Sequence, residues 1–270
     1  MHKLKYMRGM VHRSLVEMAK QWARCSPSVN PATIKREDWA GSLSDPSAFY
    51  LRCFRAFRQL PRDLIAHRAY FTSNKRGFGE DAFHTLWYLL FREFHPGNFL
   101  EIGVYRGQVI SLIALLARVE NRSCHVAAVS PFTDAGDNVS TYASTVDYFG
   151  DTLTNFDHFG LEHPELLKAF STDAAARVLI SGRSWDMIYI DGCHEYEIAR
   201  QDWELCAGSV REGGVIILDD AGRSTSYQPR FFATAGHPGP SRLATEISRK
   251  EFREILQVGH NRVFQKIGNS

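Results

Sequence analysis

The apolar positions of this chain predict one amphipathic helix followed by an alternating series of strands and helices. From residue 83 onward, apolar side chains recur at the spacing of one helix face: Phe83, Leu86, Trp87, Leu90, Phe91 and Phe94. The sequence His95-Pro96-Gly97-Asn98 then ends this helix. Five short apolar runs follow, typical of strands that are buried on both faces of a parallel sheet: Phe99–Ile102, Val126–Val129, Leu166–Phe170, Met187–Ile190 and Val215–Leu218. The stretches between them, such as Val109–Val119 and Glu195–Val210, are long enough for crossover helices.

The last segment has a different pattern. Phe252–Val258 and Arg262–Ile267 flank the turn sequence Gly259-His260-Asn261, which predicts a β-hairpin at the edge of the sheet. The predicted fold class is therefore α/β, with a doubly wound, Rossmann-like and mostly parallel sheet and a C-terminal antiparallel hairpin.

Residues 1–82 differ from the rest, since they are rich in arginine, lysine and aromatic residues and contain no clear strand. We predict a helical N-terminal extension over residues 1–82 and one further domain over residues 83–270. The first basic residues (Lys3, Lys5, Arg8 and Arg13) either contact an anionic surface or form a solvated helix face, and the second is the simpler interpretation.

Composition narrows the function classes. The 270 residues are 44% hydrophobic and 23% charged, as in an ordinary globular protein, and the net charge of +2 gives no reason to expect a nucleic-acid partner. The five cysteines include no Cys-x-x-Cys pair, so we expect neither a disulfide framework nor a zinc knuckle, and a reducing, cytoplasmic location. The longest apolar run, Leu86–Phe91, is too short to span a membrane.

In an open α/β sheet, ligands bind beyond the carboxyl ends of the strands, so the residues there are the candidates for chemistry. The first strand ends in Glu101-Ile102-Gly103, and Gly107 precedes the next helix. Gly103 suits a tight strand-to-helix turn, and Gly107 would let the backbone approach a ligand. The carboxylate of Glu101 favours a ligand that presents an ammonium group and disfavours a diphosphate.

Three carboxylates follow the fourth and fifth strands, namely Asp191 and the pair Asp219 and Asp220. Because adjacent strand ends bring them together, with no obvious basic partner in the sequence, a cation is expected to compensate their charges. Hard divalent cations such as Mg²⁺ take oxygen ligands of this kind. Each aspartate alone could equally be the N-cap of the following helix.

The combination of Glu-x-Gly-x-x-x-Gly, Asp-Gly-x-His and Gly-Gly-x-x-x-x-Asp-Asp resembles the class I S-adenosylmethionine (SAM)-dependent methyltransferases. Within them the chain is similar to the metal-dependent macrocin and sugar O-methyltransferase branch, over roughly residues 83–267. The resemblance implies that Glu101 and Gly103 lie along the methionine part of SAM, with Gly107 opening the helix. Ser130 falls at the ribose position, where the family has an acidic residue for which Asp134 or Asp137 could substitute, and Ser171 falls in the adenine-contacting segment.

The same resemblance implies that Asp191, Asp219 and Asp220 bind a divalent metal ion, which we expect to be Mg²⁺. It also implies that Asp191 borders the cofactor. His194 is then the candidate general base, because its unperturbed pKa suits proton transfer at neutral pH. A purely structural role for His194 stays open, as does a role for Cys193 as thiolate.

The sequence therefore predicts a SAM-dependent, Mg²⁺-dependent O-methyltransferase that acts on a hydroxyl of a sugar or other small natural product. The alternatives are a SAM-fold binding or scaffold protein without turnover and a nicotinamide-dependent Rossmann enzyme. The expected partner is a small hydroxyl compound, and the aromatic N-terminal region could also support a homo-oligomer. In the long segment after the fifth strand, Tyr227, Phe231 and Phe232 either cover the acceptor or pack on the N-terminal helices.

Overall fold

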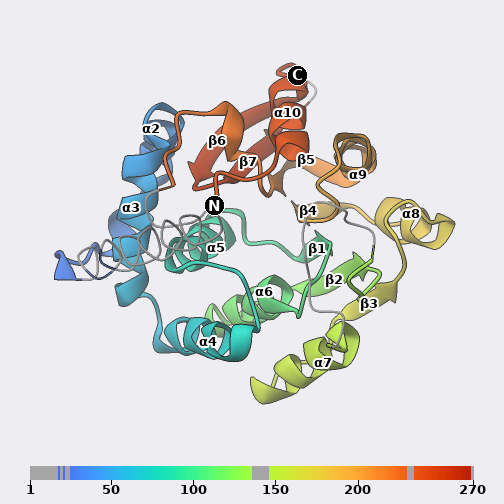
Figure 1. Ribbon diagram of the computed structural model, residues 1–270, viewed down its shortest axis with the longest axis horizontal. Helices are drawn as coiled ribbons and strands as arrows, with labels where there is room; N and C mark the ends of the chain where they lie inside the picture. Colours follow the sequence, from blue (N-terminus) through green and yellow to red (C-terminus); the bar gives the residue numbers. More distant parts are fainter. Residues whose placement is uncertain (1–17, 19–20, 22–24, 136–145, 230–233, 269–270) are drawn as a thin grey trace, which may run out of the picture.

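The computed structural model describes residues 18, 21, 25–135, 146–229 and 234–268. Within these residues the strands form one seven-stranded sheet in the order β3-β2-β1-β4-β5-β7-β6 (Figure 1). The strands are β1 (Asn98–Ile102), β2 (His125–Ser130), β3 (Glu165–Lys168), β4 (Trp185–Ile190), β5 (Val210–Leu218), β6 (Phe252–Val258) and β7 (Asn261–Lys266). The first five pair in parallel, whereas β7 is antiparallel to both of its neighbours. The predicted α/β fold with a C-terminal antiparallel hairpin is confirmed.

Helices cover both faces of the sheet (Figure 1). The α-helices are α2 (Ala40–Ser44), α3 (Pro46–Ala56), α4 (Arg62–Thr72), α5 (Asp81–Phe94), α6 (Gln108–Val119), α7 (Tyr148–His158), α8 (Ala174–Ser181), α9 (Tyr196–Ser209) and α10 (Pro238–Glu246). Short 3₁₀ turns lie at Pro31–Thr33, Arg36–Trp39, Phe57–Gln59, Ser73–Lys75 and Gly222–Ser224. None of the described helices combines the length and hydropathy needed to cross a bilayer.

Alternate side chains of each central strand enter two separate apolar clusters, as the two-residue period of a strand requires. Phe99 and Met187 pack with α3, α5 and α6 on one face, whereas Leu100 and Ile188 pack with α8, α9 and α10 on the other. Glu101 therefore points to the same face as Phe99, beneath α5 and α6. Burying both faces explains why these strands are continuously apolar in sequence.

Two element boundaries differ from the sequence pattern. The third strand ends at Lys168, not at Phe170, because the carboxylate of Asp173 accepts the amide N–H of Phe170 at 2.9 Å and draws the chain into a turn. The fifth strand begins at Val210, which pairs with Trp185 across a register shift, and so takes in residues that precede the apolar run.

The described part of the predicted N-terminal extension is helical, and it shares one apolar core with the residues that follow it. Tyr50 and Phe54 of α3 belong to the same cluster as Leu86 of α5, and α2 and α3 also contact β6. A boundary at residue 82 stays a prediction. The basic residues at positions 3–13 lie outside the described residues.

Candidate functional site

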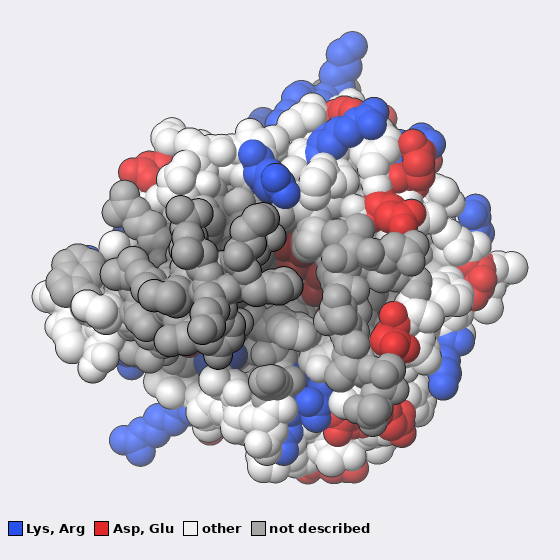
Figure 2. Space-filling model, in the orientation of Figure 1, with Lys and Arg blue, Asp and Glu red and all other residues white. Residues whose placement is uncertain are grey.

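A cavity of about 500 Å³ opens where the central parallel strands end, and acidic side chains are visible at the bottom of a hollow in this face (Figure 2). Chain connections leave β1 and β4 in opposite directions along the sheet, so this is the topological switch point at which such folds bind ligands. Eight of the nine residues nominated from the sequence line the cavity: Glu101, Gly103, Ser130, Ser171, Asp191, His194, Asp219 and Asp220.

Glu101 brings a buried carboxylate to the cavity wall. One oxygen accepts the backbone N–H of Ile110 in the first turn of α6, while the other, Oε2, has no hydrogen-bond partner among the described residues. Burial raises the pKa of Glu101 well above its ordinary value, and the nearby Asp219 raises this pKa further. A carboxylate held this way is suited to a cationic ligand group, which would both pair with Oε2 and favour the ionised form.

The two glycines of the first loop have different roles. Gly103 has a φ of +89°, and a Cβ there would lie 2.1 Å from the carbonyl oxygen of Asp191, so only glycine lets β1 and β4 end this close together. Gly107 also has a positive φ, but it does not line the cavity. A Cβ at Gly107 would lie 2.7 Å from the side chain of Thr152. Gly107 therefore lets α7 pack closely and does not serve the close approach of a ligand that the sequence suggested.

The two serines hold backbone and side-chain partners of their own. The Ser130 hydroxyl donates to the carbonyl of Val104 at 3.2 Å and accepts the amide N–H of Phe132 at 3.3 Å. Ser171 hydrogen-bonds Asp202, whose pKa burial raises to about 6. Both serines border the cavity while fixing the loops around it. Asp134, a suggested substitute for the ribose-binding acid, is exposed, and Asp137 lies outside the described residues.

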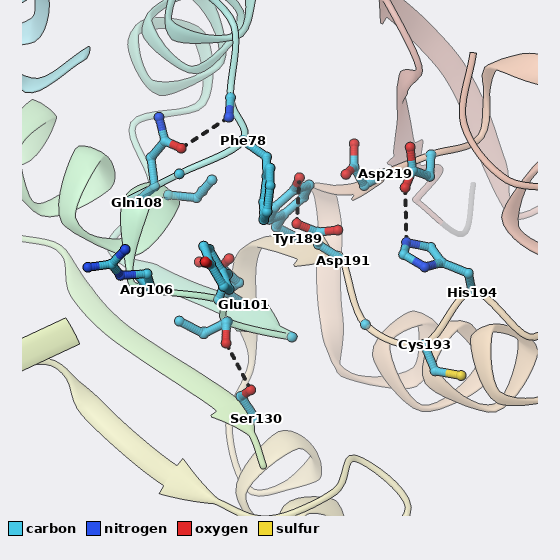
Figure 3. Close-up of a pocket in the computed structure, with 18 of the residues that line it drawn as sticks. Phe78, Glu101, Arg106, Gln108, Ser130, Tyr189, Asp191, Cys193, His194 and Asp219 are labelled. Carbon is cyan, nitrogen blue, oxygen red and sulfur yellow. Dashed lines mark hydrogen bonds and ion pairs between the residues drawn. The ribbon is translucent and has the colours of Figure 1, made fainter. Parts of the chain in front are cut away.

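Asp191 and Asp219 lie close to Tyr189 where β4 and β5 end (Figure 3). The Tyr189 hydroxyl donates to Asp191 Oδ2 at 3.2 Å, and the two carboxyl groups share a hydrogen bond. Burial raises the pKa of Asp191 well above its ordinary value, and the charges of Asp219 and Asp220 raise it further. The sequence expectation that these carboxylates converge is therefore correct for the strand ends.

The expectation that they lack basic partners is wrong, because three histidines surround Asp220. Asp220 Oδ2 lies 2.9 Å from His194 Nε2 and 3.6 Å from His237 Nε2, and Oδ1 lies 3.1 Å from His260 Nδ1. Burial alone would raise the pKa of Asp220, but the His194 hydrogen bond and the imidazole charges bring it below its ordinary value. Asp220 also has a φ of +51°, an uncommon backbone conformation for a residue other than glycine.

Comparison with known proteins finds a family model that matches part of the chain. Residues 100–221 match a family model described as "Methyltransferase domain". This segment runs from β1 to the residue after Asp220 and contains the three carboxylates. Residues 100–221 therefore resemble a methyltransferase domain. The sequence resemblance to class I methyltransferases is thus confirmed.

Solved structures agree with this domain at the level of the fold. A putative caffeoyl-CoA O-methyltransferase from Staphylococcus aureus is 14% identical, with a TM-score of 0.56 over 78% of this chain and 95% of that one. An O-methyltransferase from Bacillus cereus, solved in complex with SAH, is 16% identical, with a TM-score of 0.54 over 87% of this chain and 100% of that one. Among curated proteins, R132 of Acanthamoeba polyphaga mimivirus, described as uncharacterized, is 23% identical over 157 residues, which cover 57% of this chain and 62% of that protein.

His194 and its neighbour Cys193 point in different directions (Figure 3). The His194 ring faces Asp220 and stacks on His237 with 4.1 Å between ring centroids, whereas the Cys193 sulfur points away from Asp191 and Asp219. Of the two candidate bases, His194 is therefore the one oriented toward the carboxylates.

Three site residues escaped the sequence reasoning. His237 precedes α10, His260 occupies the β6–β7 turn, and Phe78 lies in the loop before α5, where it is 59% exposed and contacts the ring of Tyr105 at 4.8 Å. Of the three, His260 has the clearest signal in the sequence, because it lies in the Gly259-His260-Asn261 turn of the predicted hairpin. Of the suggested lid residues, Tyr227 is buried against Tyr50 of α3, which confirms packing on the N-terminal helices, and Phe231 and Phe232 lie outside the described residues.

Proposed function

We propose that this protein is a SAM-dependent O-methyltransferase. The observation that carries the proposal is the buried carboxylate of Glu101, with one unpartnered oxygen in a cavity at the switch point of a methyltransferase domain. SAM has a primary ammonium group in its methionine part, which would supply the missing hydrogen bond. The cavity volume of about 500 Å³ also lies within the range of small-molecule sites.

The residues around the cavity fit the cofactor. Glu101 would accept a hydrogen bond from the ammonium group. The Gly103 turn would leave room for the methionine part beside β1. Ser130 and Ser171 border the segments expected along the ribose and adenine. When bound, SAM would supply an electrophilic methyl group on its sulfonium sulfur. The chain's part is to hold the acceptor hydroxyl in line with that methyl group and to exclude water.

A divalent cation beside Asp219 and Asp220 belongs to the same proposal, and the sequence predicts Mg²⁺ with Asp191 as third ligand. The donors fit a cation, since two carboxylates whose side chains are each 12% exposed lie next to each other at the carboxyl end of β5. A cation there would lower the pKa of an acceptor hydroxyl and fix its position.

His194 is proposed to accept the proton of that hydroxyl. Its ring is oriented by Asp220 through the 2.9 Å contact at Nε2, and the carboxylate would stabilise the imidazolium that forms. A sugar or other small natural product is proposed as acceptor on the strength of the sequence resemblance alone. The absence of a nucleic-acid partner, a cytoplasmic location and a homo-oligomer are proposed from the net charge, the cysteine pattern and the aromatic N-terminal region, respectively.

Calorimetry on the purified chain tests the cofactor. We expect binding of SAM and of S-adenosylhomocysteine and none of NAD⁺. Binding of NAD⁺ in place of SAM would contradict the proposal in favour of a nicotinamide enzyme.

Turnover is tested by release of S-adenosylhomocysteine with a panel of small hydroxyl compounds. Loss of His194 as base is expected to lower kcat by ~10²–10⁴-fold in His194→Ala, whereas Cys193→Ala stays close to the parent. SAM binding without turnover on any acceptor would favour the scaffold alternative. An unchanged kcat and pH profile in His194→Ala would exclude His194 as the base.

A further inference from the structure

The ligand atoms near the end of β5 form two overlapping clusters of mixed nitrogen and oxygen donors. Atoms of Asp219, Asp220 and His260 lie within 4.8 Å of one another, and so do atoms of His194, Asp220 and His237. Asp191 belongs to neither cluster. It is instead held by the Tyr189 hydroxyl and by its hydrogen bond with Asp219.

His260 is placed rigidly beside the two carboxylates. Its Nδ1 lies 3.1 Å from Asp220 and its Nε2 lies 3.4 Å from Asp219, and its ring is 5% exposed and packs on Phe83 with 5.0 Å between centroids. From the β6–β7 turn, the imidazole thus contacts both aspartates.

Imidazole nitrogen is a favoured ligand of first-row transition-metal ions, whereas Mg²⁺ is bound through oxygen and keeps much of its water. We propose that Asp219, Asp220 and His260 bind a divalent transition-metal ion in preference to Mg²⁺. The inference rests on the cation site of the proposed function, and it replaces Asp191 by His260 as the third ligand.

The remaining histidines fit this assignment as supporting groups. His194 and His237 approach Oδ2 of Asp220, whereas His260 approaches Oδ1. The two oxygens of Asp220 are therefore divided between the metal side and two imidazoles that orient the carboxylate, as partners of metal-binding carboxylates commonly do. His194 keeps its proposed role beside the metal.

Titration of the chelator-stripped full chain with Co²⁺ and, separately, with Mg²⁺ tests the proposal without any need for turnover. We expect Co²⁺ to bind with visible d–d absorption and with a paramagnetically shifted imidazole N–H resonance. His260→Gln should weaken Co²⁺ binding at least tenfold while changing Mg²⁺ binding less than twofold. His237→Gln and Asp191→Asn are the matched controls, since each removes a partner of a carboxylate and not a proposed ligand, so each should weaken Co²⁺ binding less than His260→Gln does.

Several results would overturn the assignment. They are equal affinity for Mg²⁺ and Co²⁺ in the parent, no shifted imidazole resonance, or a greater loss of Co²⁺ in Asp191→Asn or His237→Gln than in His260→Gln. If His260→Gln does not fold, the shifted resonance assigns His260 when it persists in His194→Gln and in His237→Gln, the variants that remove the other two imidazoles beside Asp220. SAM binding by the same stripped protein is measured in parallel, so that failure of the metal assignment is separate from failure of the proposed methyltransferase activity.

Discussion

Nε2 of His67 in α4 lies 3.0 Å from the hydroxyl of Ser111 in α6. Ser111 in turn donates to the carbonyl of Gly107 at 2.6 Å, and His67 Nδ1 contacts His84 Nε2 at 3.1 Å. A buried row of polar groups thus connects the N-terminal helices with the start of the helix that follows Glu101 and Gly103. Because both rings are enclosed, this row makes the stability of the fold depend on pH.

The contribution of His67 and His84 to stability should fall as the pH drops below about 6.5, the pKa of an unfolded histidine. Burial lowers the pKa of His67 to about 3 and that of His84 well below its ordinary value, so in this range the unfolded chain binds protons that the folded chain does not. Each such histidine contributes a slope of up to about 1.4 kcal/mol per pH unit. Urea unfolding of the ligand-free protein between pH 7 and 4 measures it.

In that experiment His67→Asn should reduce the slope of the unfolding free energy against pH by the amount that corresponds to about one proton taken up on unfolding. This holds whatever the effect of the substitution on stability at pH 7. His95→Asn is the control, because His95 is exposed and asparagine tolerates its left-handed backbone. Equal slopes for the parent and His67→Asn would show that His67 is not buried in its neutral form.

Glu101→Gln should weaken SAM binding while leaving the ligand-free fold as stable as the parent or more so. A hydrogen bond to a charged group contributes ~1.5–3 kcal/mol, so Kd should rise about 10- to 100-fold. The unfolding free energy should not fall, because a buried carboxylate with an unpartnered oxygen is costly. Calorimetry and urea unfolding separate the two effects, with the exposed Glu162→Gln as control. Unchanged affinity for SAM would remove Glu101 from the cofactor site.

Gly103→Ala should be far more damaging than Gly160→Ala, although both glycines have a positive φ. At Gly160 a Cβ has open space, so the cost is the left-handed backbone alone, ~1–2 kcal/mol. At Gly103 the Cβ would also meet the Asp191 carbonyl at 2.1 Å, which requires β1 and β4 to move apart. The structure therefore predicts a loss of stability in addition to any steric block of SAM at this turn. Thermal unfolding of both variants measures the difference, and equal melting temperatures would contradict it.

Ser130→Asp should lower stability and weaken SAM binding. Aspartate at this position would match the acidic residue that the family has beside the ribose, which by itself would favour SAM binding. In the structure the buried hydroxyl donates to the Val104 carbonyl, and an ionised carboxylate cannot donate. Ser130→Ala, which only removes the hydroxyl, should cost ~1 kcal/mol by urea unfolding. A tighter SAM complex in Ser130→Asp would restore the sequence-based view.

The strand ends could be found from sequence because a chemical rule connects position and function. Apolar runs locate buried strands, and parallel strands have their carboxyl ends at one edge of the sheet. The sequence alone therefore predicts that Asp191, Asp219 and Asp220 converge. The partners of Ser130 were not accessible this way, because they are backbone groups whose positions depend on how the loops fold.

His260 was missed for a topological reason. The hairpin itself is evident from the sequence, but the pattern does not say which of its strands pairs with β5. The structure places β7 there, with Arg262 opposite Leu218, so the turn that precedes β7 lies beside Asp219 and Asp220. Had β6 been the inner strand, the antiparallel register would have taken the same turn elsewhere.

The placement of β7 between β5 and β6 also sets an order in time. A ribosome releases β1 to β5 and the carboxylates of Asp219 and Asp220 well before the turn that contains His260. Until β7 emerges, the edge of β5 is unpaired and Asp220 lacks one of its three imidazoles. The C-terminal hairpin thus supplies both the strand that covers the edge of β5 and the imidazole of His260, so closure of this edge and completion of the group around Asp220 depend on the same segment.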